Sequence, residues 1–242
     1  MATVVVEGSL PRSRAKTRTR FYVGMSLLIV AIVLAGFGPS FFNMATGAPR
    51  PWFFHLHGAV FLGWLALLVC QAVLGARGKI ALHRRVGSFG VAYGALLWIV
   101  GLVMTFYSTA LHLRAGEWDM DRAAAFLTIP LGDMVLFGGF FAAAIAYRRK
   151  PEIHKRLILL ACVAVMFAGA FRLRYIVGVP VQIAVWYSPV IAGMLYDRLR
   201  LGRVHRVYWI GAAIMAVALA RLPFGETEVW RRIGSALLAP LV

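Results

Sequence analysis

The chain has 242 residues, 61% of them hydrophobic, and a formal net charge of +17. Soluble domains are only about half apolar, and several stretches approach the ~20 apolar residues that a membrane-spanning helix needs. These features exclude a soluble globular domain, and the sequence lacks the alternating segments of about ten residues that would indicate a β-barrel. No basic run is interleaved with aromatic residues, so we expect no nucleic-acid partner; the positive charge predicts cytoplasmic loops in contact with anionic lipids.

The apolar segments predict an all-α protein, a polytopic bundle of about seven transmembrane helices. A basic cytoplasmic tail covers residues 1–20, a single transmembrane domain covers 21–222, and 223–242 is expected to form an interfacial amphipathic tail. The predicted spans, in chain order, are Phe21–Phe42, Trp52–Leu74, Val86–Leu111, Ala123–Tyr147, Leu157–Tyr175, Val177–Tyr196 and Tyr208–Leu222.

The basic residues predict the orientation of the bundle. Most of the 26 lysine and arginine residues lie in the N-terminal tail and in the loops after the second, fourth and sixth spans. Positive charge gathers on the cytoplasmic side of a membrane. We therefore expect the N-terminus inside, the C-terminus outside, and a multi-pass protein of a bacterial inner (plasma) membrane.

The C-terminal segment can form a short amphipathic helix. Val229, Trp230, Ile233 and Leu237 can share one helical face, with basic residues beside them. Such a pattern is typical of a helix that lies on the membrane surface.

Polar side chains at membrane depth are costly, which makes them candidates for function. In the second span, His57, Phe61, Trp64, Leu68 and Gln71 follow a heptad-like stripe. His57 and Gln71 should therefore share a face, about 21 Å apart along the helix. We expect this face to point into the bundle.

Asp133 lies inside the fourth span, shortly after Pro130, whose ring should kink the helix and release a carbonyl group. The acid could carry a proton or anchor a ligand, or it could pair with an arginine or cap the broken backbone. Arg172 and Arg221, near the outer ends of the fifth and seventh spans, are candidate partners. The sequence leaves these alternatives open.

Three histidines, His83, His154 and His205, each open a helix from a basic loop on the predicted cytoplasmic side. Histidines in such loops usually contact headgroups, but His83 and His154 begin helices that could be neighbours. Imidazole can ligate haem iron, zinc or copper, and nearby positive charge disfavours its protonated form. His83 and His154 are therefore candidate ligands, and no metal is assigned.

Several of these residues form a recognisable pattern, which covers roughly residues 50 to 175. It comprises His55-Leu56-His57-Gly58, Trp64, Gln71, His83-Arg84-Arg85-Val86-Gly87 and Pro151-Glu152-Ile153-His154-Lys155-Arg156-Leu157. The pattern resembles a group of bacterial multi-span membrane proteins of unknown function. The segment around His154 is also similar to one in small membrane proteins linked to cytochrome oxidase assembly. The resemblance implies haem-linked or respiratory-chain work, without an established reaction.

The leading hypothesis is a redox protein associated with haem b or quinone, or an assembly factor for a respiratory complex. Two-haem membrane cytochromes place ligands near both faces of the membrane, and this sequence has histidines at both predicted faces. The candidate cofactor-binding residues are His57, His83, His112, His154, Gln71 and Arg172.

Two other classes remain open. A transporter or channel would use Asp133, Gln71, Arg172 and Gln182 to line a proton or ligand path, since transporters often combine broken helices with intramembrane charge. An accessory subunit of a larger membrane complex would account for the short loops and the small soluble part, and it implies membrane-protein partners.

Other functional classes are disfavoured. Every lysine lies in the tail or the loops, so a retinal Schiff base in the last span is excluded. The sequence has no H-E-x-x-H motif and no glycine-rich nucleotide loop. Cys70 and Cys162 fall inside apolar runs, which predicts buried packing residues rather than a redox pair.

Overall fold

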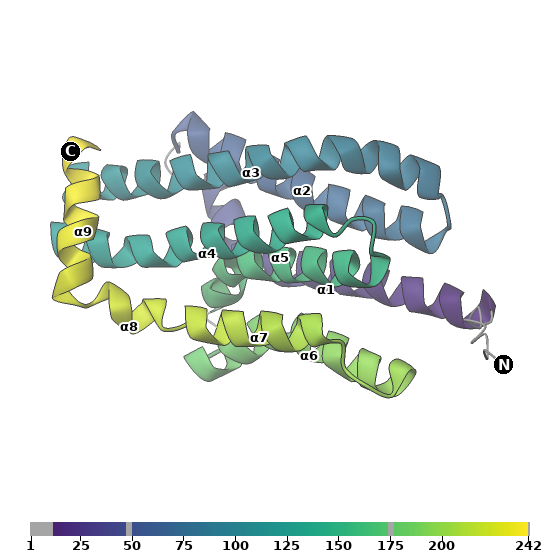
Figure 1. The fold of residues 1–242 in the computed structure, drawn as a ribbon. Coiled ribbons are helices and arrows are strands. Elements are labelled where there is room, and N and C mark those ends of the chain that lie inside the picture. Colours follow the sequence, from purple (N-terminus) through teal and green to yellow (C-terminus); the bar gives the residue numbers. More distant parts are fainter. Residues whose placement is uncertain (1–11, 47–49, 174–176, 242) are drawn as a thin grey trace.

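The computed structural model describes residues 12–46, 50–173 and 177–241, and the regular structure of these residues is entirely helical (Figure 1). The main helices pack side by side as a bundle, and the last long helix lies across one end of it. The elements are α1 (Arg12–Thr46), α2 (Trp52–Ala76), α3 (Ile80–Arg114), α4 (Met120–Ala146), α5 (Pro151–Arg172), α6 (Val179–Leu201), α7 (Arg206–Ala218), α8 (Arg221–Gly225), α9 (Glu228–Leu238) and a 3₁₀ turn, Ala239–Leu241.

Seven stretches of the described residues are long and apolar enough to cross a membrane. The prediction of an all-α bundle with seven candidate spans is thereby confirmed. The spans are Arg20–Pro39, Trp52–Ala76, Ile80–Arg114, Met120–Ala146, Pro151–Arg172, Val179–Leu201 and Arg206–Gly225.

Several helices extend further into the basic segments than hydropathy predicts. Helix α3 begins at Ile80 rather than Val86, α5 begins at Pro151 rather than Leu157, and α6 ends at Leu201 rather than Tyr196. Charged residues lower the mean hydropathy of a segment but are good helix formers. The helices therefore continue where the apolar pattern stops.

The two ends of the bundle differ in charge and in what covers them. The turns between α2 and α3, between α4 and α5 and between α6 and α7 lie at the end that also holds the start of α1 (Figure 1). We call this end, with the turns 77–79, 147–150 and 202–205, the basic end. The C-terminus and α9 lie at the opposite end, as an odd number of spans requires.

Helix α5 is the centre of the bundle. In its apolar window 67% of the residues are buried, the largest fraction among the candidate spans. Helix α1 comes so close to it that a Cβ added at Gly36 would lie 2.0 Å from the carbonyl oxygen of Gly169. Small residues let two helix backbones meet in this way. A side chain at Gly36 would therefore force the two helices apart.

Helix α9 packs on the bundle with one face and exposes another. The indole Nε1 of Trp230 donates a hydrogen bond of 2.7 Å to the carbonyl oxygen of Ala124. Val229, Ile233 and Leu237 are exposed. Trp230 lies on the same side of the helix as these three residues, at its edge, and its indole turns toward α4 to reach the carbonyl.

Pro130, Pro180 and both cysteines lie within the spans, and the structure shows how each is accommodated. Pro180 lies in the first turn of α6, where a proline is tolerated. Helix α4 continues through Pro130 to Ala146, so the helix is not broken there. Cys162 is buried as predicted, but Cys70 is exposed, because its side of α2 faces away from the other helices.

Candidate functional site

A cavity of about 200 Å³ lies toward the basic end and is lined by residues of α1, α2, α3, α4 and α5. It brings together Gln71, His83 and His154, which are far apart in the sequence. Most of the remaining lining is apolar, and it includes the rings of Trp64 and Phe141. His83 and His154 thus line one cavity, although α3 and α5 pack mainly against other helices.

Both imidazole rings are held in one tautomer by backbone carbonyl groups. His83 Nδ1 lies 3.2 Å from the carbonyl oxygen of Gln71, and His154 Nδ1 lies 2.8 Å from that of Ala144. A carbonyl oxygen only accepts, so each Nδ1 must donate. In a neutral ring the proton on Nδ1 leaves a lone pair on Nε2. Each ring can therefore accept a hydrogen bond, or bind a metal, at Nε2.

The side-chain amide of Gln71 can both donate and accept hydrogen bonds at this cavity. Both its Nε2 and its Oε1 are buried and lack a hydrogen-bond partner among the described residues. Gly87 faces this amide, and a Cβ there would lie 3.5 Å from Nε2. Burying a polar group without a partner costs about 1–3 kcal/mol. An unsatisfied amide beside a cavity therefore points to a ligand that makes the missing bonds.

The size of the cavity and its donor set limit the choice of ligand. Drug-sized ligands occupy pockets of about 300–1,000 Å³, so a volume of about 200 Å³ suits one small ring better than a porphyrin. Across the described residues, no group of three or more histidine, cysteine, aspartate or glutamate side chains could hold a metal ion.

Two other candidate cofactor residues, His57 and His112, do not line this cavity. His57 is half-buried with its ring centroid 4.2 Å from that of Phe61, and its Nδ1 is buried without a hydrogen-bond partner in the described part of the chain. His112 lies 2.5 Å from Glu117, measured from Nδ1 to Oε2, and its ring stacks on Trp118. The predicted cofactor residues therefore lie in more than one place.

Asp133 is paired, and its partner is Arg221. Arg221 Nη2 lies 2.5 Å from Asp133 Oδ1, and its guanidinium also lies over the ring of Phe167. Arg172 instead lies over the ring of Phe37 and interacts electrostatically with His57. The expected pair of Asp133 with Arg172 is wrong, and the alternative partner, Arg221, is confirmed. Helix α5 ends with Arg172 turned toward α1 rather than α4.

The residues of the predicted transport path are not brought together. Gln182 Nε2 donates a 3.0 Å hydrogen bond to the carbonyl oxygen of Val177, which ties down the start of α6. Gln71 lines the cavity described above, whereas Asp133 does not. Arg174, also predicted at the outer end of the fifth span, lies outside the described residues.

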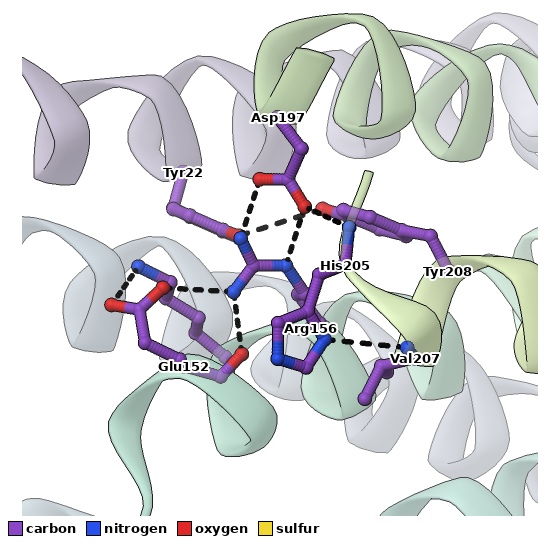
Figure 2. A network of polar contacts seen from close by, with 8 residues as sticks. Tyr22, Glu152, Arg156, Asp197, His205, Val207 and Tyr208 are labelled. Atoms are coloured by element: carbon purple, nitrogen blue, oxygen red, sulfur yellow. Dashed lines mark hydrogen bonds and ion pairs between the residues drawn. The ribbon is translucent and has the colours of Figure 1, made fainter. Parts of the chain in front are cut away.

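A second polar site, not predicted from the sequence, is the network around Arg156 and Asp197 (Figure 2). Arg156 Nε donates to Asp197 Oδ2 over 2.9 Å, and Nη2 binds Oδ1 of the same carboxylate. Arg156 Nη1 donates to both the carbonyl oxygen and Oε2 of Glu152. Arg156 and Asp197 are buried. The network therefore joins α5 to the end of α6 by a bidentate ion pair.

Aromatic residues complete this network. Tyr208 lies against the Arg156 guanidinium and in hydrogen-bond range of the Tyr22 hydroxyl, with the two hydroxyl oxygens 3.5 Å apart. A Cβ at Gly193 would lie 2.4 Å from the Tyr208 hydroxyl, so the glycine makes room for the ring. Helices α1, α5, α6 and α7 thus meet around one arginine.

The turn before α7 also joins this network. Gly202 ends α6 with a φ of 70°, a left-handed conformation that favours glycine. The chain then returns so that the His205 backbone N–H donates to Asp197 Oδ2 over 3.1 Å, while His205 Nδ1 accepts from Val207 N–H. Burial, followed by the charge of Arg156, lowers the pKa of His205. A neutral ring suits its role as an acceptor.

A signal for this network was present in the sequence. Asp197 is the one acidic residue in the strongly basic segment 196–206. The predicted sixth span ended at Tyr196, which left Asp197 in a loop, and Arg156 was assigned to a basic loop for the same reason. A single acid among many cations could have been read as a pairing residue.

Comparisons with protein families, with curated proteins and with solved structures give no match for this chain.

Proposed function

We propose that this chain is a membrane protein that binds the ring of a quinone or quinol in the cavity at the basic end. The observation that carries the proposal is the convergence of Gln71, His83 and His154 on one small, otherwise mostly apolar cavity. It favours the quinone alternative of the respiratory-chain hypothesis over the haem alternative.

The hydrogen-bonding groups match the two oxygens of such a ring. A quinol hydroxyl can donate to the Nε2 lone pair of His83 or His154, because their Nδ1 atoms already donate to carbonyl oxygens. The amide of Gln71 can donate from Nε2 to a ring oxygen or accept a hydroxyl proton at Oε1. The same three side chains therefore serve both oxidation states.

The cavity walls match the remainder of such a molecule. Trp64 and Phe141 offer aromatic faces, and aliphatic side chains cover much of the rest. Tyr22, Ser26 and Lys155 complete the lining. Aromatic rings pack favourably against a flat ring. Gly87 and Gly90 from α3 line one side, and the lack of side chains there keeps that wall thin. The glycines of the third span thus combine packing with ligand approach.

Binding of decylubiquinone and of its reduced form to the purified protein in detergent tests the proposal. We expect saturable binding at one site per chain. Gln71→Leu, His83→Leu and His154→Leu should each weaken it about 5- to 30-fold, as expected for the loss of one buried hydrogen bond.

His57→Leu is the matched control, because His57 lies on the same helix as Gln71 but outside the cavity. Binding that is unchanged in the Gln71, His83 and His154 variants, or lost equally in His57→Leu, would contradict the proposal. A Soret absorption band in protein produced with haem supplied would favour the haem-bearing alternative instead.

A further inference from the structure

A groove of about 720 Å³ lies on another side of the bundle, where α4, α5 and α7 meet. Its residues are distinct from those of the cavity that holds Gln71. Helix α4 contributes to both, with Phe141 in the cavity and Gly139 and Ala143 in the groove. The groove is therefore a separate site from the proposed quinone cavity.

The long part of the groove is apolar and open. Leu157 from α5 and Ile214 from α7 line it, and Ile214 is exposed. A Cβ at Gly139 would meet no atom within 4 Å. This section belongs to candidate membrane spans, so hydrocarbon chains are the expected surroundings. The groove is therefore shaped to take an extended acyl chain.

The end of the groove at the basic end carries two cations that have no acidic partner among the described residues. Lys150 and Arg206 both line it. Neither forms an ion pair with any residue that the structure describes; Lys150 Nζ lies 5.5 Å from the centroid of the Tyr147 ring. Positive charge next to an acyl-sized groove is complementary to a phosphate on a lipid.

A neutral donor lies beside these cations. His205 also lines the groove, and its Nδ1 accepts a hydrogen bond from Val207 N–H. The proton of the neutral ring is therefore on Nε2, which can donate to a phosphate or ester oxygen. Two cations and one donor thus gather where a lipid headgroup would lie.

We propose that this groove is a binding site for one phospholipid with an anionic headgroup. Its acyl chain follows Gly139, Leu157 and Ile214, and its phosphate binds Lys150 and Arg206. A transmembrane helix of a partner or a second copy would fill the apolar part but would leave both cations without an anion.

Native mass spectrometry of the detergent-purified protein, titrated with dioleoyl phosphatidylglycerol or dioleoyl phosphatidylcholine, tests the site. We expect one phosphatidylglycerol to be retained at concentrations at which phosphatidylcholine is not. The double variant Lys150→Gln/Arg206→Gln should weaken phosphatidylglycerol binding about 10- to 30-fold, because each cation near an anionic lipid contributes a several-fold factor.

The matched control is Arg84→Gln/Arg85→Gln, which removes two exposed cations near the basic end but outside the groove. It should retain phosphatidylglycerol like the unchanged protein. Equal losses in the two double variants, or equal retention of the two lipids by the unchanged protein, would overturn the proposal.

Filling the groove provides a second test. Gly139→Leu introduces a side chain into open space, so folding should be preserved while retention of phosphatidylglycerol falls. If Gly139→Leu instead disrupts a dimer or a complex with another protein and leaves lipid retention unchanged, a protein helix occupies the groove and the lipid proposal is wrong.

Discussion

Two buried arginine–aspartate pairs join helices in this protein, and they differ in how fully they are satisfied. In the first, Arg156 binds Asp197 through two nitrogens and Glu152 through the third. In the second, Arg221 binds Asp133 through Nη2 alone, and its Nε and Nη1 are buried without a partner among the described residues. The chemical groups are the same, but their surroundings are not.

The difference follows from what the chain places near each arginine. Glu152 precedes Arg156 by one helical turn, and the turn at Gly202 returns His205 to the same carboxylate. Arg221 has no such neighbour and lies over the ring of Phe167. A buried charge is stabilised only when its remaining hydrogen-bonding groups are also satisfied. The first pair should therefore stabilise the fold, and the second should not.

The largest effect is expected for the satisfied pair. Asp197→Ala leaves Arg156 buried without its carboxylate and removes the acceptor of the His205 N–H. We expect a loss of about 3–5 kcal/mol of unfolding free energy, measured by denaturant unfolding in detergent. Arg156→Met/Asp197→Leu removes both charges and should be less destabilised than the single variant. A loss below about 1 kcal/mol in Asp197→Ala would show that this network is not a structural anchor.

The second pair should respond in the opposite direction. Asp133→Leu/Arg221→Met replaces a partly satisfied ion pair by apolar side chains, and we expect it to be neutral or to raise the unfolding free energy by up to about 3 kcal/mol. The same unfolding experiment measures it, with Asp133→Leu alone as the destabilised reference. A large loss in the double variant would mean that the pair has partners or a role beyond stability.

The hydrogen bond between Trp230 and Ala124 joins two uncharged groups, and its contribution to stability can be compared with those of the two ion pairs. Trp230→Phe keeps a ring between α9 and α4 but removes the donor to the Ala124 carbonyl oxygen. The expected cost is about 1 kcal/mol, seen as a lower unfolding midpoint and faster proteolysis of the C-terminal helix. Val229→Ala, on the exposed side of α9, should change stability by less than about 0.5 kcal/mol. Equal effects would contradict the packing of Trp230 on α4.

The smallest expected effect is the contribution of His205, which lies beside the Arg156–Asp197 pair, to the pH dependence of stability. Burial and the charge of Arg156 lower the pKa of His205 in the folded protein, so protonation favours the unfolded chain. This contribution is fully present above the ordinary histidine pKa of about 6.5 and is lost as the pH falls through the lowered value. In His205→Asn, which keeps an acceptor for Val207 N–H, the unfolding midpoint should fall less between pH 8 and 5.5. An unchanged slope would exclude His205 as its source.

Much of the fold could be predicted because the hydropathy of a candidate span depends only on the residues of that span. The run Trp52–Leu74 was predicted within a few residues of α2, and the start of the sixth span within a few residues of Val179. The starts of α3 and α5 and the end of α6 were predicted several residues away from their positions, because these helices continue into charged residues. The network was missed with them, since Arg156 and Asp197 lie in those extensions.

The candidate site was predicted in part for a related reason. Gln71, His83 and His154 stood out one by one, as a polar residue in a span and as histidines at helix starts, and the structure joins them in one cavity. The partner of Asp133 could not be decided from the sequence, because two arginines lay at a suitable depth. Only the rotation of each helix about its axis selected Arg221.

By itself, the sequence determined the class of the protein, the candidate spans and the charge difference between its two ends. These properties follow from the transfer of apolar segments out of water, which depends on composition over about 20 residues. The tertiary structure alone decided which polar groups meet, which are satisfied and which remain without partners. Those outcomes depend on contacts between side chains from different helices, and therefore on how the helices pack rather than on any one segment.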